Sequence, residues 1–278
     1  MGVRVNILWI AKTNGFCRAL MLAAPLWILN CPKVTSGAFT QPSGQGLIIA
    51  TASFTTSGQG FDNKGFPGLT ARTQKRELSL YGEYGITDWL TGIGQTTAAS
   101  RSLSGIVSDH FTGLDYTAAG LRAKVATLGR FVLSVEGNLR IPGASDGKRP
   151  AQAGHTGFES DLRIQAGVNF DLWSWASFAD ASVGYRMRSG DPASEYRGDF
   201  TFGTRPKERW LWLLQSFNTM SEGKGRNGFP AQREHKLQSS VVYDINKAWS
   251  VQLGAVSTLA GKNTTRDMGG FVSIWRRF

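Results

Sequence analysis

Residues 158–171 read FESDLRIQAGVNFD, and mainly apolar residues alternate with mainly polar ones along this stretch. An α-helix repeats its apolar residues about every 3.6 positions, and a strand buried on both faces is apolar throughout. The stretch therefore predicts a strand with one apolar and one polar face. The apolar face, which also holds Ser160, consists of Phe158, Leu162, Ile164, Ala166, Val168 and Phe170; the polar face consists of Glu159, Asp161, Arg163, Gln165, Asn169 and Asp171, with Gly167.

Strands of this kind recur along the chain. The pattern predicts twelve of them, near residues 46–57, 74–85, 90–101, 116–126, 131–141, 158–170, 175–187, 196–205, 210–220, 236–245, 249–259 and 267–278. The connections alternate between long ones, such as 58–73, 102–115 and 142–157, and short ones, such as 86–89 and 127–130. An even strand number, with short turns on one side and longer loops on the other, is typical of bacterial outer-membrane β-barrels.

An aromatic residue follows each predicted short turn. These anchors lie 42, 44, 35, 39 and 29 residues apart, and they are Trp89, Phe131, Trp175, Trp210, Trp249 and the last residue, Phe278; Trp173 lies within a turn. Aromatic rings suit the boundary between lipid and water, so one ring per turn predicts a girdle at the periplasmic interface. On the last strand, Arg276 shares the apolar face with Ile274, and this close to the end it can reach the headgroups.

The fold class predicted is all-β: a transmembrane antiparallel up-and-down β-barrel of about twelve strands in the bacterial outer membrane. No apolar stretch approaches 18 residues, which excludes a helical membrane protein. A propeller needs four strands in each period of roughly 40 residues, whereas each period here holds two. A soluble sandwich would share the alternation, but the regular loops and the turn-side aromatics favour the barrel.

Residues 1–38 predict a secretory signal peptide, and residues 39–278 predict a single barrel domain. Arg4, Lys12 and Arg18 precede an 11-residue apolar run at 19–29, and small residues precede a cleavage point after Ala38. Eleven apolar residues are too few to span a bilayer as a helix. Cys31 follows Asn30 rather than a small residue, which argues against a lipoprotein signal.

Cleavage after Ala38 would remove both cysteines and four positive charges, so the net charge would fall from +11 to +7. We therefore expect no disulfide, no cysteine-based metal site and no cofactor. The remaining cations are scattered, with no run of Lys or Arg longer than two, which argues against a nucleic-acid partner. A basic surface suits anionic lipopolysaccharide instead.

If the polar faces point inward, the lumen holds charges of both signs. A strongly selective ion pore requires rings of one sign, so mixed charges predict interior ion pairs. The sequence leaves open whether the lumen is open or filled. The residues predicted to line it are Glu77, Glu83, Arg122, Glu136, Arg140, Glu159, Asp161, Arg163, Asp180 and Arg186.

An enzymatic barrel is the least favoured interpretation. All three histidines, His110, His155 and His235, fall in connections predicted to be external loops, and Asp109 with His110 is a conceivable pair of orienting acid and base. Outer-membrane phospholipases also have twelve strands, but they carry a His-x-Ser-Asn-Gly run. Neither His110 nor His155 is followed by a nucleophile at that position. We therefore predict neither an enzyme nor a metal site.

Two stretches resemble a known family. They are the segment 38–46, AFTQPSGQG, and the hairpin 78–91, LSLYGEYGITDWLT. Both resemble the bacterial outer-membrane family labelled "meta-pathway of phenol degradation, putative", in which Trp is commoner at the position of Phe39. The resemblance implies an uptake channel for small, including aromatic, compounds, and it brings no catalytic residues.

The leading hypothesis is thus a monomeric outer-membrane channel for passive uptake of small solutes, hydrophobic or aromatic compounds among them. Its expected partners are membrane lipid, lipopolysaccharide, the solute, and the barrel-assembly machinery, which would read Phe278. The alternatives are a closed barrel with a structural or surface-binding role, and a lipid- or peptide-modifying barrel.

Overall fold

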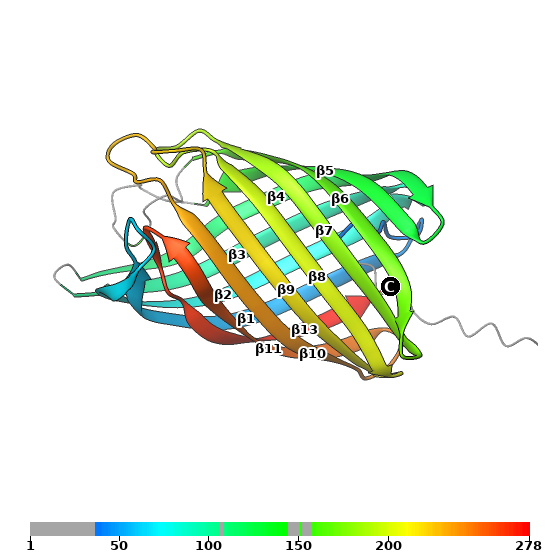
Figure 1. The fold of residues 1–278 in the computed structure, drawn as a ribbon. Helices are drawn as coiled ribbons and strands as arrows, with labels where there is room; N and C mark the ends of the chain where they lie inside the picture. Colours follow the sequence, from blue (N-terminus) through cyan, green and yellow to red (C-terminus); the bar gives the residue numbers. More distant parts are fainter. Residues whose placement is uncertain (1–36, 106–107, 144–150, 152–156) are drawn as a thin grey trace, which may run out of the picture. The chain divides into compact units, whose positions relative to one another are not determined.

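The computed structural model describes residues 37–278 except 106–107, 144–150 and 152–156, and this part of the chain is all-β. Twelve long strands and one two-residue strand follow each other along the sequence (Figure 1). They are β1 (Gly46–Phe61), β2 (Pro67–Thr87), β3 (Leu90–Ser104), β4 (Asp109–Leu128), β5 (Phe131–Pro142), β6 (Glu159–Leu172), β7 (Trp175–Arg188), β8 (Glu195–Lys207), β9 (Trp210–Ser221), β10 (Arg233–Asp244), β11 (Trp249–Lys262), β12 (Thr264–Thr265) and β13 (Met268–Arg277).

The long strands form one closed antiparallel barrel. Each pairs with its neighbours in sequence, and β1 pairs on one edge with β2 and on the other with β13. Ala50 of β1, for example, lies opposite Leu80 of β2 and Ile274 of β13. The predicted fold class, a barrel of twelve strands, is confirmed.

The strand boundaries differ from prediction mainly at the long-loop end. The predicted connections 58–73 and 102–115 are mostly strand, because β1 and β2 are separated by residues 62–66 and β3 and β4 by residues 105–108. In the outer part of β2, residues 67–76 (PGLTARTQKR) have no apolar alternation, although they pair with β1 and β3. Strand pairing depends on the backbone, and it continues where the apolar face has ended.

Side-chain burial in β6 is the reverse of that in a soluble protein. Leu162 and Ile164 are 61% and 54% exposed, whereas Glu159 and Asp161 are 2% and 3% exposed. Exposed large apolar side chains also lie on most of the other long strands. A continuous apolar outer surface is the surface of a barrel that spans a membrane with its polar side chains inside. No helix within the described ranges is long and apolar enough to cross a membrane.

The turn-side aromatic residues lie on the outer surface. Trp89, Phe131, Trp173, Trp210, Trp249 and Phe278 are all exposed, and Trp175 is half-buried. Several pack against a second ring: Trp173 on Trp175, Trp210 on Tyr243, and Phe278 on Tyr84. Arg276 lies with its guanidinium carbon 5.0 Å from the centre of the Trp249 ring, which holds this outward cation at the level of the aromatic residues.

A charge placed in the middle of the apolar outer surface should lower the free energy of unfolding more than a charge placed near the edge of that surface. Leu253 lies four residues from Trp249 and Leu259 lies ten, and both side chains are exposed on β11. We expect Leu253→Arg to lower the free energy of unfolding in phospholipid vesicles by about 2–4 kcal/mol, and Leu259→Arg by about 1 kcal/mol or less. Denaturant titration followed by Trp fluorescence measures both. Equal losses in the two variants would contradict the assigned position of the lipid band.

Candidate functional site

The ten charged residues predicted for the lumen all have buried or half-buried side chains. The structure brings most of them into two clusters on the inner wall. The inner cluster, near the short turns, holds Glu83, Arg122 and Glu136. The outer cluster, nearer the long loops, holds Arg140, Glu159, Asp161, Arg163 and Arg186. Glu77 pairs with Lys75 elsewhere on the wall, and Asp180 contacts the N-terminal segment.

In the inner cluster, Arg122 lies between two carboxylates. Its Nη1 is 2.8 Å from Glu83 Oε1, and its Nη2 is 2.8 Å from Glu136 Oε2. Gln165 also donates a hydrogen bond to Glu136, at 2.9 Å, and Tyr81 donates one to Glu83. A buried ion pair is retained only where its remaining hydrogen-bonding capacity is satisfied, and these neighbours satisfy it.

The N-terminal segment, residues 38–42, crosses the barrel interior above this cluster. At one side, the Ala38 N–H donates to Asp180 on β7, and Ser134 on β5 donates to the Ala38 carbonyl. At the other side, the Gln41 side chain donates to Glu83 on β2 at 2.7 Å, and its backbone N–H donates to Thr91 on β3 at 2.9 Å. The segment thus runs along the inner wall from β2 and β3 to β5 and β7 at the short-turn end.

Phe39 is the apolar part of this segment. Arg122 donates to its carbonyl at 3.2 Å, and its ring lies over Gly167 of β6. A Cβ at position 167 would come within 2.7 Å of that ring, so the polar face of β6 has a glycine where the segment passes. In the sequence these residues carry part of the family resemblance, and no position inside the barrel was predicted for them. Gly167, a small residue among larger polar ones on the same face, is the one signal that could have pointed to them.

An apolar cluster occupies the interior on the other side of the short-turn end. It consists of Leu47, Phe178, Leu211, Leu213, Val242 and Trp275. Trp275 also donates from Nε1 to Gln252 at 3.0 Å. The sequence pattern predicts that the apolar side chains of each strand point outward. In β9, however, Trp212 and Leu214 are exposed whereas Leu211 and Leu213 are buried, so this strand is apolar on both faces.

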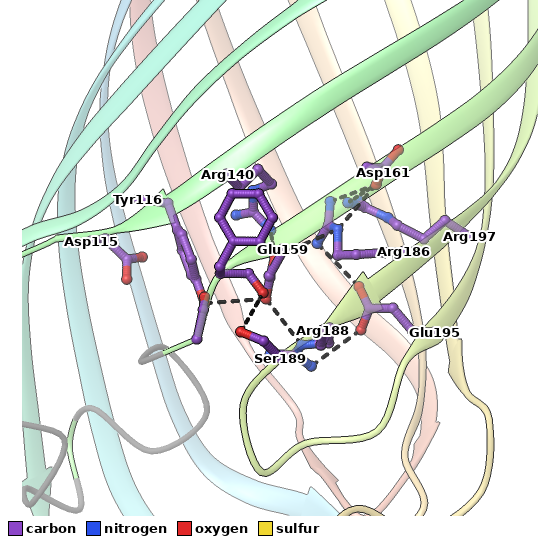
Figure 2. A network of polar contacts seen from close by, with 12 residues as sticks. Asp115, Tyr116, Arg140, Glu159, Asp161, Arg186, Arg188, Ser189, Glu195 and Arg197 are labelled. Atoms are coloured by element: carbon purple, nitrogen blue, oxygen red, sulfur yellow. Dashed lines mark hydrogen bonds and ion pairs between the residues drawn. The ribbon is translucent and has the colours of Figure 1, made fainter.

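The outer cluster is a ladder of ion pairs across β5 to β8. Figure 2 shows Glu159 on β6 between Arg140 of β5 and Arg188 of β7, with Arg188 Nε 3.0 Å from the Glu159 carboxylate. Asp161 accepts from Arg186 at 3.0 Å and from Arg163 at 2.6 Å. Glu195 of β8 contacts Arg186 and Arg188 at 3.1 and 3.5 Å. These pairs follow the strand register, in which Glu159 lies opposite both Arg140 and Arg188.

Two cavities lie along the interior. The outer cavity, of about 480 Å³, is lined by the ion-pair ladder and by residues of the long-loop end. The second cavity, of about 400 Å³, lies along the β1 and β9–β13 wall and is lined partly by Ile49, Leu213, Val256, Phe271 and Trp275. Lys75, Glu77 and Lys236 line both cavities, so the cavities adjoin.

The prediction that all three histidines lie in loops is wrong for two of them. His110 is in β4, where it contacts Ser102 and Thr112, and His235 is in β10, where it contacts Asn218. Strand pairing extends further at this end than the apolar pattern indicates. His155 lies outside the described residues, as do residues 1–36 of the predicted signal peptide. Within the described ranges, no three His, Cys, Asp or Glu residues are placed to hold a metal ion.

Solved structures match this chain in fold, whereas no protein-family model and no curated protein matches it in sequence. The COG4313 outer membrane channel from Pseudomonas putida F1 has a TM-score of 0.70 at 15% identity, covering 87% of this chain and 98% of that one. The β domain of the Bordetella autotransporter BrkA gives 0.54 at 16% identity (85% and 100% covered). The KdgM porin in complex with disordered oligogalacturonate gives 0.51 at 8% identity (84% and 99% covered). The chain therefore has the fold of outer-membrane β-barrels.

Removing the central cation of the inner cluster should destabilise the barrel strongly. In Arg122→Ala, Glu83 and Glu136 would remain buried without their shared partner, which we expect to cost about 3–5 kcal/mol in unfolding free energy. The matched control is Arg72→Ala on the same barrel, because Arg72 is exposed and its loss should cost less than about 1 kcal/mol. Reversible denaturation in detergent measures both. Similar losses in the two variants would show that the ion pairs contribute little.

Proposed function

We propose that this protein is an outer-membrane channel for passive entry of small solutes, with hydrophobic and aromatic compounds among them. The observation that carries the proposal is the pair of adjoining cavities inside a closed membrane barrel, which together extend from the long-loop end to Leu213 and Trp275 of the apolar cluster. The fold shared with an outer membrane channel supports it. No catalytic role is proposed.

The preference for apolar solutes rests on the second cavity. Phe271 and Trp275 on β13 and Leu213 on β9 face inward beside Gln215, Gln238 and Ser273. The wall of this cavity therefore combines apolar side chains, aromatic ones among them, with polar and charged ones, and the apolar part offers a contact surface for small organic molecules. The resemblance of residues 78–91 to the phenol-degradation family points to the same class of solute.

The remaining expectations about partners stay proposals. We propose that the exposed outer band contacts lipid and that the basic outer end contacts lipopolysaccharide. Phe278 closes the barrel through hydrogen bonds with Gly46, and recognition of this residue by the assembly machinery stays a prediction, as does the monomeric state. A closed barrel with a surface-binding role is the second candidate, because the N-terminal segment and the apolar cluster both occupy the short-turn end.

Removing interior side chains of the N-terminal segment should raise the conductance of the barrel. We expect the double variant Phe39→Ala, Gln41→Ala to show several-fold larger current steps than the unmodified protein in planar bilayers, because the interior side chains and the Glu83 contact of the segment are lost. Ser43→Ala is the matched control, since Ser43 directly follows the segment and is exposed. If the parent and the folded double variant both passed no current, the closed-barrel candidate would be favoured.

A charge in the second cavity should reduce entry of apolar solutes. In cells with an intact lipopolysaccharide leaflet, we expect Phe271→Glu to slow initial toluene uptake several-fold, because an apolar solute would have to pass a carboxylate. Phe271→Leu, which keeps an apolar surface, should retain most of the uptake. If toluene entered equally fast in both variants, the second cavity would not be on the solute route.

A further inference from the structure

We propose that the outer cavity is a binding subsite for small organic carboxylates with an apolar or aromatic body. The inference rests on the proposed channel function and names a solute class for its outer half. Its evidence is an excess of arginine in the ion-pair ladder, a loosely paired arginine at the cavity wall, and a set of apolar loop residues across the same space.

The ladder has more cations than acids. Its arginines are Arg140, Arg163, Arg186, Arg188 and Arg197, and its acids are Glu159, Asp161, Glu195 and Asp199. The whole cavity repeats this excess, with seven Lys or Arg side chains and five Asp or Glu side chains in its lining. Among the described residues the ladder thus has one arginine more than it has acids, and a bound anion would restore the balance.

Arg197 on β8 is the arginine that fits this role. Its one ion pair among the described residues is a long one, with Nη1 3.9 Å from Asp161, which already accepts from Arg163 and Arg186. Its Nε is buried and meets no hydrogen-bond acceptor among the described residues. Figure 2 shows Arg197 extending toward Asp161 beside Arg186, and Arg197 lines the outer cavity. A guanidinium that lines a cavity and has only a long ion pair is suited to bind a planar carboxylate by donating two hydrogen bonds to it.

Apolar residues from two connections line the same cavity. Pro192 and Ala193 come from residues 189–194, and Phe229 and Pro230 come from residues 222–232. A neutral or purely ionic solute would use only one part of this lining. A carboxylate with a hydrocarbon or aromatic body would use both, and a volume of about 480 Å³ suits a molecule of this size.

The two connections are fixed to each other before any solute arrives. Arg226 donates from its backbone to the Asp191 carbonyl at 2.7 Å and from its side chain to the Ser189 and Gly190 carbonyls at 2.8 and 2.9 Å. Asn227 donates to the Asp191 carboxylate at 3.0 Å. A rigid apolar wall loses little entropy on binding, which favours recognition of the solute body.

Calorimetric titration of the protein, extracted from the outer membrane in detergent, tests the subsite with three probes. Benzoate has both the carboxylate and the ring, acetate lacks the ring, and benzyl alcohol lacks the charge. We expect benzoate to bind at least tenfold more tightly than either of the others, after subtraction of titrations into empty micelles. Equal affinity for benzoate and benzyl alcohol, or no binding of benzoate, would overturn the proposal.

Variants of Arg197 test whether this residue binds the carboxylate of benzoate. We expect Arg197→Gln to weaken benzoate binding at least tenfold and Arg197→Lys to weaken it less, because lysine keeps the charge but loses the planar fork. Arg72→Gln, at an exposed position outside the cavity, should bind benzoate like the parent. If Arg197→Gln fails the heat-dependent gel shift of a folded barrel, Phe229→Ser provides the second test and should weaken benzoate but not acetate. Unchanged benzoate affinity in the folded variants would overturn the proposal.

Conductance separates this inference from the proposed function. A protein that binds benzoate through Arg197 but passes no current or solute would retain the subsite and refute the channel. A protein that conducts in discrete steps and binds no benzoate would retain the channel and refute the subsite.

Discussion

The pairing of β1 with β13 is the constraint on which the rest of this structure depends. Hydrocarbon offers no hydrogen-bond partner to an exposed strand edge, so a sheet can cross a membrane only when its first and last strands meet. The ladder between these strands runs from Thr56 opposite Met268 to Leu47 opposite Arg277, and Gly46 and Phe278 then exchange two backbone hydrogen bonds. Closure leaves every strand with one face toward lipid and one toward an enclosed interior.

The enclosed interior explains why the charges are arranged in pairs. Apolar side chains are taken up by the lipid, so the charged ones must be satisfied by each other across neighbouring strands. Arg122 lies opposite Glu136, Asp161 lies opposite Arg186, and Glu159 lies opposite Arg188, each on the inner face. The N-terminal segment uses the same arrangement, because its amides and carbonyls bind to the side chains that the strands present inward.

The sequence predicts the membrane-facing parts of this fold well. In β6 and β11, lipid on one side and water or ion pairs on the other impose a strict alternation, and the predicted strands agree with the observed ones within a few residues. Where a strand does not have lipid on one face and water or ion pairs on the other, its residues do not alternate, and the sequence does not predict the strand or its inward face. The outer part of β2 is polar on both faces, and the inner part of β9 is apolar on both faces because Leu211 packs inside the barrel.

The candidate site was less accessible from sequence. Residue types on the inner faces predicted a lumen of mixed charge, but which arginine meets which acid depends on strand register, and register is set by pairing between strands. The position of residues 38–42 was not predictable from their own pattern. A segment of five residues has no periodicity, and its place is determined by contacts with Glu83, Thr91 and Asp180, which are far away in sequence.

The unequal strand lengths have a consequence for how solutes approach the barrel. A tilted strand needs about 10 residues to cross the hydrocarbon layer, yet β2 has 21 residues and β4 has 20, while β5, β9 and β10 have 12 each. At about 3.3 Å per residue and a tilt near 45°, the surplus raises β2 and β4 roughly 25 Å beyond the lipid, and β3, which has 15 residues, roughly 12 Å. Arg72, Gln74 and Thr112 lie on this raised part. The long-loop end of the barrel is thus uneven, and a molecule that approaches it meets long strands at β2 and β4 and short ones at β9 and β10.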